Sequence, residues 1–383
     1  MRDNAGMRRA FAICLICTLA HAAEPDWSVH IAPYQQVFPA LELSQARRNE
    51  NAAVSDHVLG NGSGLIAVRV RARHAGERVV LRIAVPELGS PQGFGATLAQ
   101  ADVEYELHPP LAWDLTALRP LSTARPTRME FALERDGAAA EKREAAISLR
   151  PLSEALYYVR DDKDSADLSW IFAAYVNERD AVVDQVLDAA LASGIVDNFT
   201  GADADSIQRQ VWAIWQALAA RGIRYSGADP ALERGPHVFS QRVRFLRETW
   251  SDASANCVDG SVLIASVLQR IGLRTFIVLV PGHAFVGFFS DPDAQRTAYL
   301  ETTLLGARVD APASAPAFAA GLLTNAQRRN SLAGFLAALA AGNAHHARVA
   351  AKLDGRHRPD YVVIDISAAR AFGIRPIEAP PPD

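Results

Sequence analysis

The segment 254-SANCVDGSVLIASVLQRIGLRTFIVLVPGHAFVGFF-289 decides the fold of the second half of this chain. Apolar residues follow Cys257 at helical spacing as far as Gly272, which suits a helix end, so the pattern predicts a helix. Ser254 or Asn256 can cap its start, which places Cys257 in the first turn. The continuous apolar run after the helix predicts a buried strand. A helix followed by a buried strand indicates an α+β fold.

The lengths of these two elements predict that His283 returns to the level of Cys257. The helix carries the chain about 22 Å away from Cys257 at 1.5 Å per residue. Residues 273–283 span up to roughly 36 Å when fully extended, which is enough for the return. Free N–H groups and the macrodipole at a helix start favour a thiolate. We therefore expect Cys257 to be a nucleophile and His283 its imidazolium partner.

A predicted hairpin supplies an acidic partner for His283. The strands 283–289 and 295–303 flank 290-SDPDA-294, which is rich in turn residues. With this five-residue loop, counting outward from the turn places Glu301 directly across from His283. Glu301 would then hold the tautomer and orientation of the imidazole.

The acidic neighbours of this hairpin offer alternatives to Glu301. Asp291 and Asp293 are also near His283 in the sequence, but they fall in the predicted turn. Asp259 follows Cys257 closely, and we expect it to cap or charge the helix start rather than to take part in catalysis.

No cofactor or metal is expected. Cys257, His283 and Glu301 could together ligate zinc, yet no HxxxH or CxxC pair supports such a site in the mature chain. Cys14 and Cys17 do have CxxC spacing, but they lie inside an apolar export segment.

An attack on a carbonyl also requires donors for the oxygen that becomes negative. The backbone N–H of Cys257 is available at the helix start. Gln241 or Trp250, in the stretch 240-SQRVRFLRETW-250, can supply a side-chain donor. Both side chains also suit a purely structural role.

At these residues the sequence resembles the transglutaminase-like superfamily, in which a Cys opens a helix, a His follows on a strand and an acid lies on the next strand. The matching segments are 256-NCVDGSVLIASVLQRIGL-273, 282-GHAFVGFF-289 and 299-YLETT-303. The resemblance covers roughly residues 205–305. It implies a papain-like α+β catalytic fold, a thiol hydrolase or acyltransferase site and no required cofactor. Glu301 stands where the family usually has Asp, and the interval from Cys to His is short.

The remainder of the chain predicts further domains. Residues 64–73, 78–85 and 128–135 alternate or run in β-branched residues, which favours an all-β, sandwich-like domain over 23–152. Helical patterns follow at 181–195 and 205–223, the second with buried tryptophans at 212 and 215. We therefore predict a helical lead-in and transglutaminase-like core over 153–310, and a C-terminal extension over 311–383 with a helix at 326–342 and a strand at 361–367.

Residues 1–22 have the features of a cleaved secretory signal peptide. Arg8 and Arg9 precede the apolar run Phe11 to Leu19, and Ala20-His21-Ala22 suits cleavage. No later apolar segment is long enough for a membrane helix. The expected location is therefore exported, either periplasmic or secreted.

Composition excludes some classes of partner. The chain is 49% hydrophobic and 21% charged, which is typical of a soluble globular protein. Cleavage of the signal peptide removes three arginines and one aspartate, so the net charge falls from -4 to about -6. A mildly acidic chain without basic runs is not expected to bind nucleic acid.

These patterns support two functional hypotheses. The first is an exported thiol-dependent hydrolase or acyltransferase that acts on amide bonds of a protein or peptide, for example in the cell envelope, through Cys257, His283 and Glu301. The second is a catalytically inactive transglutaminase-like module that binds or assembles cell-envelope partners. In the second hypothesis Cys257 packs as a small hydrophobe.

Overall fold

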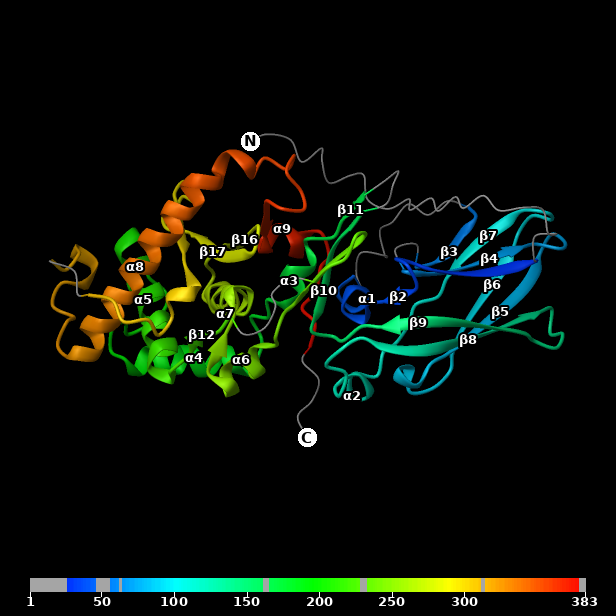
Figure 1. Ribbon diagram of the computed structural model, residues 1–383, viewed down its shortest axis with the longest axis horizontal. Helices are drawn as coiled ribbons and strands as arrows, with labels where there is room; N and C mark the ends of the chain where they lie inside the picture. Colours follow the sequence, from blue (N-terminus) through cyan, green and yellow to red (C-terminus); the bar gives the residue numbers. More distant parts are fainter. Residues whose placement is uncertain are drawn as a thin grey trace. The chain divides into compact units, whose positions relative to one another are not determined.

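The computed structural model describes residues 26–45, 56–61, 64–160, 165–227, 233–310 and 314–378. Helices and strands both occur throughout these ranges, which confirms the mixed α+β class (Figure 1). The predicted signal peptide, with Cys14 and Cys17, lies outside the described residues. Within them, no helix is both long and apolar enough to cross a membrane.

The chain divides into two compact units. As far as they are described, unit 1 holds residues up to Leu168 together with 235–238, and unit 2 holds 169–234 and 239–378. The division after Leu168 lies beyond the boundary predicted at residue 152, because the strands that follow Leu152 belong to unit 1.

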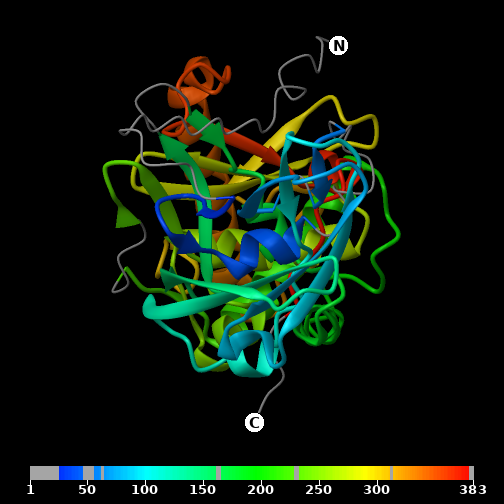
Figure 2. The same ribbon diagram turned by 90° about the vertical axis from the view of Figure 1, so that its right-hand side faces the viewer.

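Unit 1 is built mainly of strands (blue to green in Figure 1 and Figure 2). Its elements are β1 Trp27–Ile31, β2 Gln36–Val37, α1 Pro39–Ser44, β3 Val58–Gly60, β4 Ile66–Arg71, β5 Glu77–Ala84, η3 Pro86–Leu88, β6 Gln92–Leu98, β7 Glu104–His108, α2 Leu115–Leu118, β8 Arg125–Arg135, β9 Glu141–Leu149, β10 Glu154–Arg160 and β11 Ser165–Asp167. A four-stranded sheet has the order β1-β4-β7-β3, and a five-stranded sheet has the order β2-β9-β8-β5-β6.

Alternating side chains explain these strands. Every second residue of β4 and β5 is buried, and the second half of β8 shows the same alternation. Leu81 and Phe131, for example, are buried completely. The alternation confirms the strands predicted at 64–73, 78–85 and 128–135.

Unit 2 combines helices with a second set of strands (Figure 1). Its helices are α3 Ile171–Tyr175, α4 Ala181–Ala192, α5 Ala204–Arg221, α6 Leu246–Asp252, α7 Cys257–Arg270, η4 Thr302–Leu304, η5 Ala317–Ala319, α8 Ala326–Val349, η6 Ala350–Lys352 and α9 Ile366–Ala371. Its strands are β12 Arg224–Tyr225, β13 Glu233–Arg234, β14 Val238–Arg242, β15 Ser254–Ala255, β16 Thr275–Val280, β17 His283–Phe289, β18 Thr297–Leu300 and β19 Val362–Asp365.

Helix α5 has the caps and the buried face that its sequence predicts. Asp203 accepts a hydrogen bond from the first turn, and Gly222 ends the helix with a φ of +85°. Trp212 and Trp215 are both buried. The Trp212 Nε1–H donates to Ser331 Oγ on α8 (3.0 Å), so the two helices pack together.

The central sheet of unit 2 has the strand order β18-β17-β16-β19. Helix α7 packs against β16 and β17. The sheet carries a buried apolar cluster of Phe276, Val278, Val280, Phe285 and Tyr299. Residues at the end of α8 and in the chain after it pack against this cluster: Val349, Leu353 and Tyr361. All six residues of β16 are buried, which explains the apolar run from Phe276 to Val280.

Helix α8 differs from its prediction in length. It runs to Val349 and does not end near residue 342 as expected. Gly342 does not end the helix. It lies where α8 contacts β18. A Cβ on Gly342 would lie 2.4 Å from the Tyr299 carbonyl oxygen. Gly342 thus permits a close approach of helix and strand, and the residues after it remain helical.

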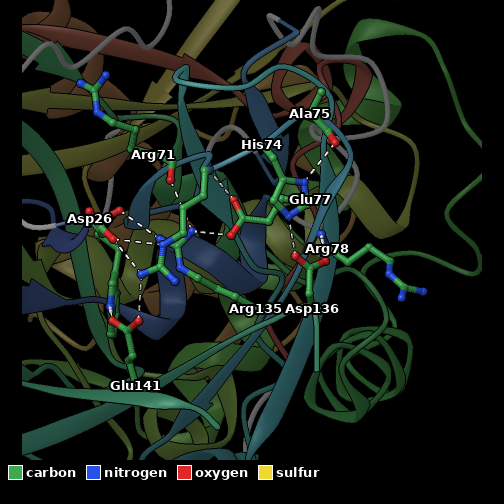
Figure 3. Close-up of polar contacts among 11 residues, drawn as sticks. Asp26, Arg71, His74, Ala75, Glu77, Arg78, Arg135, Asp136 and Glu141 are labelled. Carbon is green, nitrogen blue, oxygen red and sulfur yellow. Dashed lines mark hydrogen bonds and ion pairs between the residues drawn. The ribbon is translucent and has the colours of Figure 1, made fainter. Parts of the chain in front are cut away.

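A buried ion pair lies within the five-stranded sheet of unit 1, and its arginine also bonds to backbone oxygens on β4 and just before β1 (Figure 3). The Arg135 guanidinium on β8 donates to Glu77 Oε1 on β5 (2.8 Å) and to the backbone oxygens of Asp26 (3.1 Å) and Arg71 (3.3 Å). The side chains of Arg135 and Glu77 are only 5% and 1% exposed. A charged pair so far from water depends on both of its members.

We predict that Arg135→Met lowers the free energy of unfolding by about 3–5 kcal/mol, because it leaves the Glu77 carboxylate buried without its partner. The matched control is Arg82→Met, which breaks the exposed pair of Arg82 with Glu134 on the same two strands and should cost less than about 1 kcal/mol. Urea unfolding measures both. Equal effects of the two variants would contradict the prediction.

Candidate active site

Helix α7 presents Cys257 at its N-terminus. Asn256 is the N-cap, and its Oδ1 accepts hydrogen bonds from the N–H groups of Val258 (2.8 Å) and Asp259 (2.9 Å). The Asn256 N–H donates to Asp259 Oδ2 (3.1 Å), which completes a capping box. The predicted helix start is confirmed, and Asn256 rather than Ser254 is the cap.

Asp259 also holds the chain that precedes the helix. Its buried carboxylate accepts hydrogen bonds from the Arg244 N–H (2.9 Å) and the Arg244 Nε–H (2.9 Å). The capping role predicted for Asp259 is confirmed. The bond to Arg244 was not predicted, because Arg242, Arg244 and Arg247 have the spacing of an exposed basic edge.

His283 opens β17 directly after a tight turn. Val280 pairs with His283 across Pro281 and Gly282. Gly282 has a φ of +73°, a conformation that favours glycine. The hairpin fixes His283 at the first position of its strand.

The register predicted for the pairing of β17 with β18 is wrong by two residues. Glu301 nevertheless lies on the same face of the sheet as His283, as predicted. A five-residue loop would pair Phe289 with Gln295, whereas the structure pairs Phe289 with Thr297. A shift of two residues leaves Glu301 on the same face, because side chains alternate with a period of two. Glu301 follows the last residue of β18, and its Oε2 accepts a hydrogen bond from His283 Nε2 (2.7 Å).

The residues after Glu301 tie it to the start of α7. Glu301 Oε1 accepts hydrogen bonds from the Thr303 N–H (3.2 Å) and Oγ1–H (2.7 Å). The Thr302 Oγ1–H donates to the Cys257 carbonyl oxygen (3.2 Å). Gly260 allows this approach, since a Cβ there would lie 3.0 Å from Thr302 Cβ. The sequence had given no reason to single out Thr302, Thr303 or Gly260.

His283 donates a hydrogen bond to Glu301, and its pKa responds to both Glu301 and Cys257. Burial alone would lower the pKa of His283, but its interactions with these two partners outweigh burial and raise the pKa to about 9. Burial likewise acts to raise the pKa of Glu301, but the bonds from His283 and Thr303 outweigh it and lower that pKa. An imidazolium therefore faces a carboxylate at neutral pH.

The hydrogen-bond chemistry assigns the two ring nitrogens of His283. A carboxylate can only accept, so Nε2 carries the hydrogen that points to Glu301. Nδ1 is then the nitrogen available to the Cys257 sulfur. The arrangement can take a proton from a thiol and return it to a leaving group.

The rival acids have other partners. Asp291 accepts hydrogen bonds from the N–H groups of Gln295 and Arg296, so it closes the loop between β17 and β18. The backbone oxygen of Asp293 accepts a hydrogen bond from the Gln295 side chain (2.9 Å). Glu301 is the acid that the structure bonds to His283.

The oxyanion candidates stay predictions. The Gln241 amide Nε2–H donates to the carbonyl oxygen of Arg242 (2.9 Å), and the Gln241 side chain is buried on β14. Trp250 lies on α6, with the Arg221 guanidinium over its ring (5.3 Å). Asn256 accepts from the N–H groups of Val258 and Asp259 rather than from that of Cys257.

One residue near the site was missed entirely by the sequence analysis. His345 lies on the part of α8 beyond the predicted helix end. Its ring stacks on that of His283, with centroids 5.1 Å apart and planes 6° apart. His345 Nδ1 is 3.8 Å from Glu301 Oε2. A correct prediction of the length of α8 is the sequence signal that could have indicated His345.

His283, Glu301 and His345 could in principle hold a metal ion, because each offers a ligand atom within 4.8 Å of the others. The electrostatics favour a different use. A metal needs a lone pair on the ligating nitrogen, whereas His283 Nε2 carries a hydrogen bonded to Glu301. The raised pKa of His283 keeps the ring protonated at neutral pH, so the ion pair competes strongly with a metal.

Comparisons with known proteins do not assign this chain to a family. No protein-family model matches the chain, and a search of curated proteins also finds no match.

We predict that His283→Gln lowers stability at neutral pH and that the loss shrinks as the pH rises. The folded pKa of His283, about 9, lies above the ordinary value near 6.5, so its contribution is complete below pH 6.5 and disappears as the pH passes 9. We expect a loss on the order of 1–2 kcal/mol at pH 6.5, allowing for solvent screening.

Urea unfolding at pH 6.5 and pH 10 tests this prediction. His346→Gln is the matched control, since His346 stacks on Tyr299 instead of the site and burial lowers its pKa. Its effect should not change between these two pH values. A pH-independent loss for His283→Gln would show that its charge does not stabilise the fold.

Proposed function

We propose that this chain is an exported thiol-dependent hydrolase or acyltransferase that acts on amide bonds of peptides, including isopeptides. The observation that carries the proposal is His283, which donates a hydrogen bond to Glu301 and whose pKa is raised by its interactions with both Cys257 and Glu301. A nucleophile, a base and an orienting acid in contact are the minimum for acyl transfer through a covalent intermediate.

The surroundings of the site support a transglutaminase-like, papain-like core in unit 2. Cys257 opens a helix that packs on an antiparallel sheet, His283 begins one strand of that sheet, and Glu301 follows the neighbouring strand. This order of elements is the one the sequence resemblance implies. In the same proposal, the two sheets of unit 1 form the β-sandwich-like domain.

The proposed reaction has two steps. The Cys257 sulfur, having given its proton to His283, attacks the carbonyl carbon of the amide and forms a tetrahedral intermediate. As the C–N bond breaks, His283 gives its proton to the leaving amine and a thioester remains. Water or an amine then attacks the thioester with His283 as base, and Cys257 recovers its proton.

The parts around the triad have supporting roles in this proposal. Glu301 holds the His283 ring in place and stabilises its charge. The N–H of Cys257 lies at the positive end of α7, where it can donate to the developing oxyanion. Gln241 is the proposed second donor, and it must release the Arg242 carbonyl to act. The chemistry requires no cofactor or metal.

The substrate class and the location follow from the same proposal. An N-terminal signal over residues 1–22 would direct the chain to the periplasm or the exterior. A protein or peptide of the cell envelope is then the substrate that such a site would meet.

One observation favours a second function. Cys257 is only 4% exposed, which leaves little access for a carbonyl group. In this alternative, unit 2 is a catalytically inactive module that binds or assembles cell-envelope partners, and the thiol is part of its core.

Alkylation of Cys257 by iodoacetamide between pH 5 and 9 separates the two functions. We expect wild-type protein to react at a rate that stays high well below the free-thiol pKa of about 8.5, because His283 accepts the thiol proton. His283→Ala should lower the rate at pH 6 by at least about tenfold. Mass spectrometry of the peptide that contains Cys257 measures the rate without interference from other cysteines.

Two controls complete the experiment. His346→Ala should leave the alkylation profile as in wild type. Cys257→Ser should abolish any amide hydrolysis that wild-type protein shows on a peptide library. A thiol that is inert, or that reacts equally in wild type and His283→Ala, would reject the enzyme and favour the binding module.

A further inference from the structure

Helix α8 brings a second imidazole to the site. The His345 ring lies parallel to the His283 ring, and it also stacks on Phe285 with centroids 5.0 Å apart. Its Nδ1 is 3.8 Å from Glu301 Oε2, the oxygen that accepts the hydrogen bond from His283. His345 thus faces both members of the ion pair.

The position of His345 is set by the same backbone that places Glu301. The Glu301 N–H donates to the Ala338 carbonyl oxygen on α8 (3.0 Å). The Tyr299 N–H donates to Asn343 Oδ1 (2.9 Å). These bonds occupy the outer edge of β18, so α8 cannot shift along the strand without losing them.

The charge of His345 decides what it does to the pair. A neutral ring stacks on the His283 imidazolium without repulsion. A protonated ring would place a second positive charge beside His283 and would offer Glu301 Oε2 a competing partner. The charged groups that face His345 are His283 on β17, Glu301 before η4 and Arg348 on α8 itself.

The environment keeps His345 neutral at neutral pH. Burial lowers its pKa from the ordinary value, and the positive charges of His283 and Arg348 lower it further, against the opposing effect of Glu301. The ring therefore gains its proton at a lower pH than an ordinary histidine does.

We propose that His345 is a positioning residue of this site, which supports the bond between His283 and Glu301 while neutral and weakens that bond when protonated. The inference rests on the proposed function, and it makes the site sensitive to mild acid. His345 touches no reacting atom, so it acts through His283.

Nuclear magnetic resonance of the full chain labelled with ¹⁵N-histidine tests the inference, because the His283 Nε2–H bonded to Glu301 can be followed directly from pH 8 to pH 4.5. In wild type we expect its resonance to move and broaden as His345 titrates. His345→Phe keeps a flat ring without a charge, so the resonance should persist to a pH at least about one unit lower. His345→Gln is a second uncharged variant.

Two further variants sharpen the comparison. His345→Lys carries its charge at every pH used, so it should displace the resonance over the whole range and slow Cys257 alkylation at pH 7 by about tenfold. His346→Phe is the matched control on the same helix, since His346 stacks on Tyr299, and it should titrate like wild type.

The outcomes separate this inference from the proposed function. If His345→Phe and His345→Gln both give the wild-type profile of the His283 resonance, His345 does not position the pair and the inference is overturned. Alkylation that still depends on His283 would then leave the enzyme proposal standing. Alkylation independent of His283 would reject the enzyme proposal, whatever the resonance shows.

Discussion

The hydrogen bond from His283 Nε2 to Glu301 is the interaction on which the site depends. It keeps an imidazolium charged in a partly buried place where burial alone would remove the proton. It also leaves Nδ1 as the ring nitrogen available to Cys257. Without the bond, the ring could rotate and the thiol would face an uncharged partner. The elements around the site hold the two residues of this bond in fixed positions.

The chain segment 299–303 provides most of that constraint. Tyr299 and Glu301 are bonded to α8 through their N–H groups. Thr302 bonds to the backbone of Cys257, and Thr303 holds the second carboxylate oxygen of Glu301. A single segment thus links α7, the sheet and α8. Residues far apart in the sequence acquire a fixed geometry because each is bonded to this short stretch.

The sequence could predict the elements whose signals are local. The helix after Asn256 and the strand of β16 follow from caps and apolar runs. The register of β18 could not be predicted, because Asp291 closes a longer loop by bonding backbone N–H groups. The place of His345 at the site could not be predicted from the sequence, because its partners lie on other elements.

The side chain of Glu301 explains why a wrong register still placed the acid correctly. Glu301 lies after the last paired residue of β18, where the chain turns into η4. From this position the carboxylate must reach back to His283 while its other oxygen remains bonded to Thr303. A glutamate has one more methylene than an aspartate, which supplies that reach. The glutamate thus suits the local backbone, because a shorter carboxylate at this position could bond to His283 only if the backbone after β18 lay closer to the imidazole.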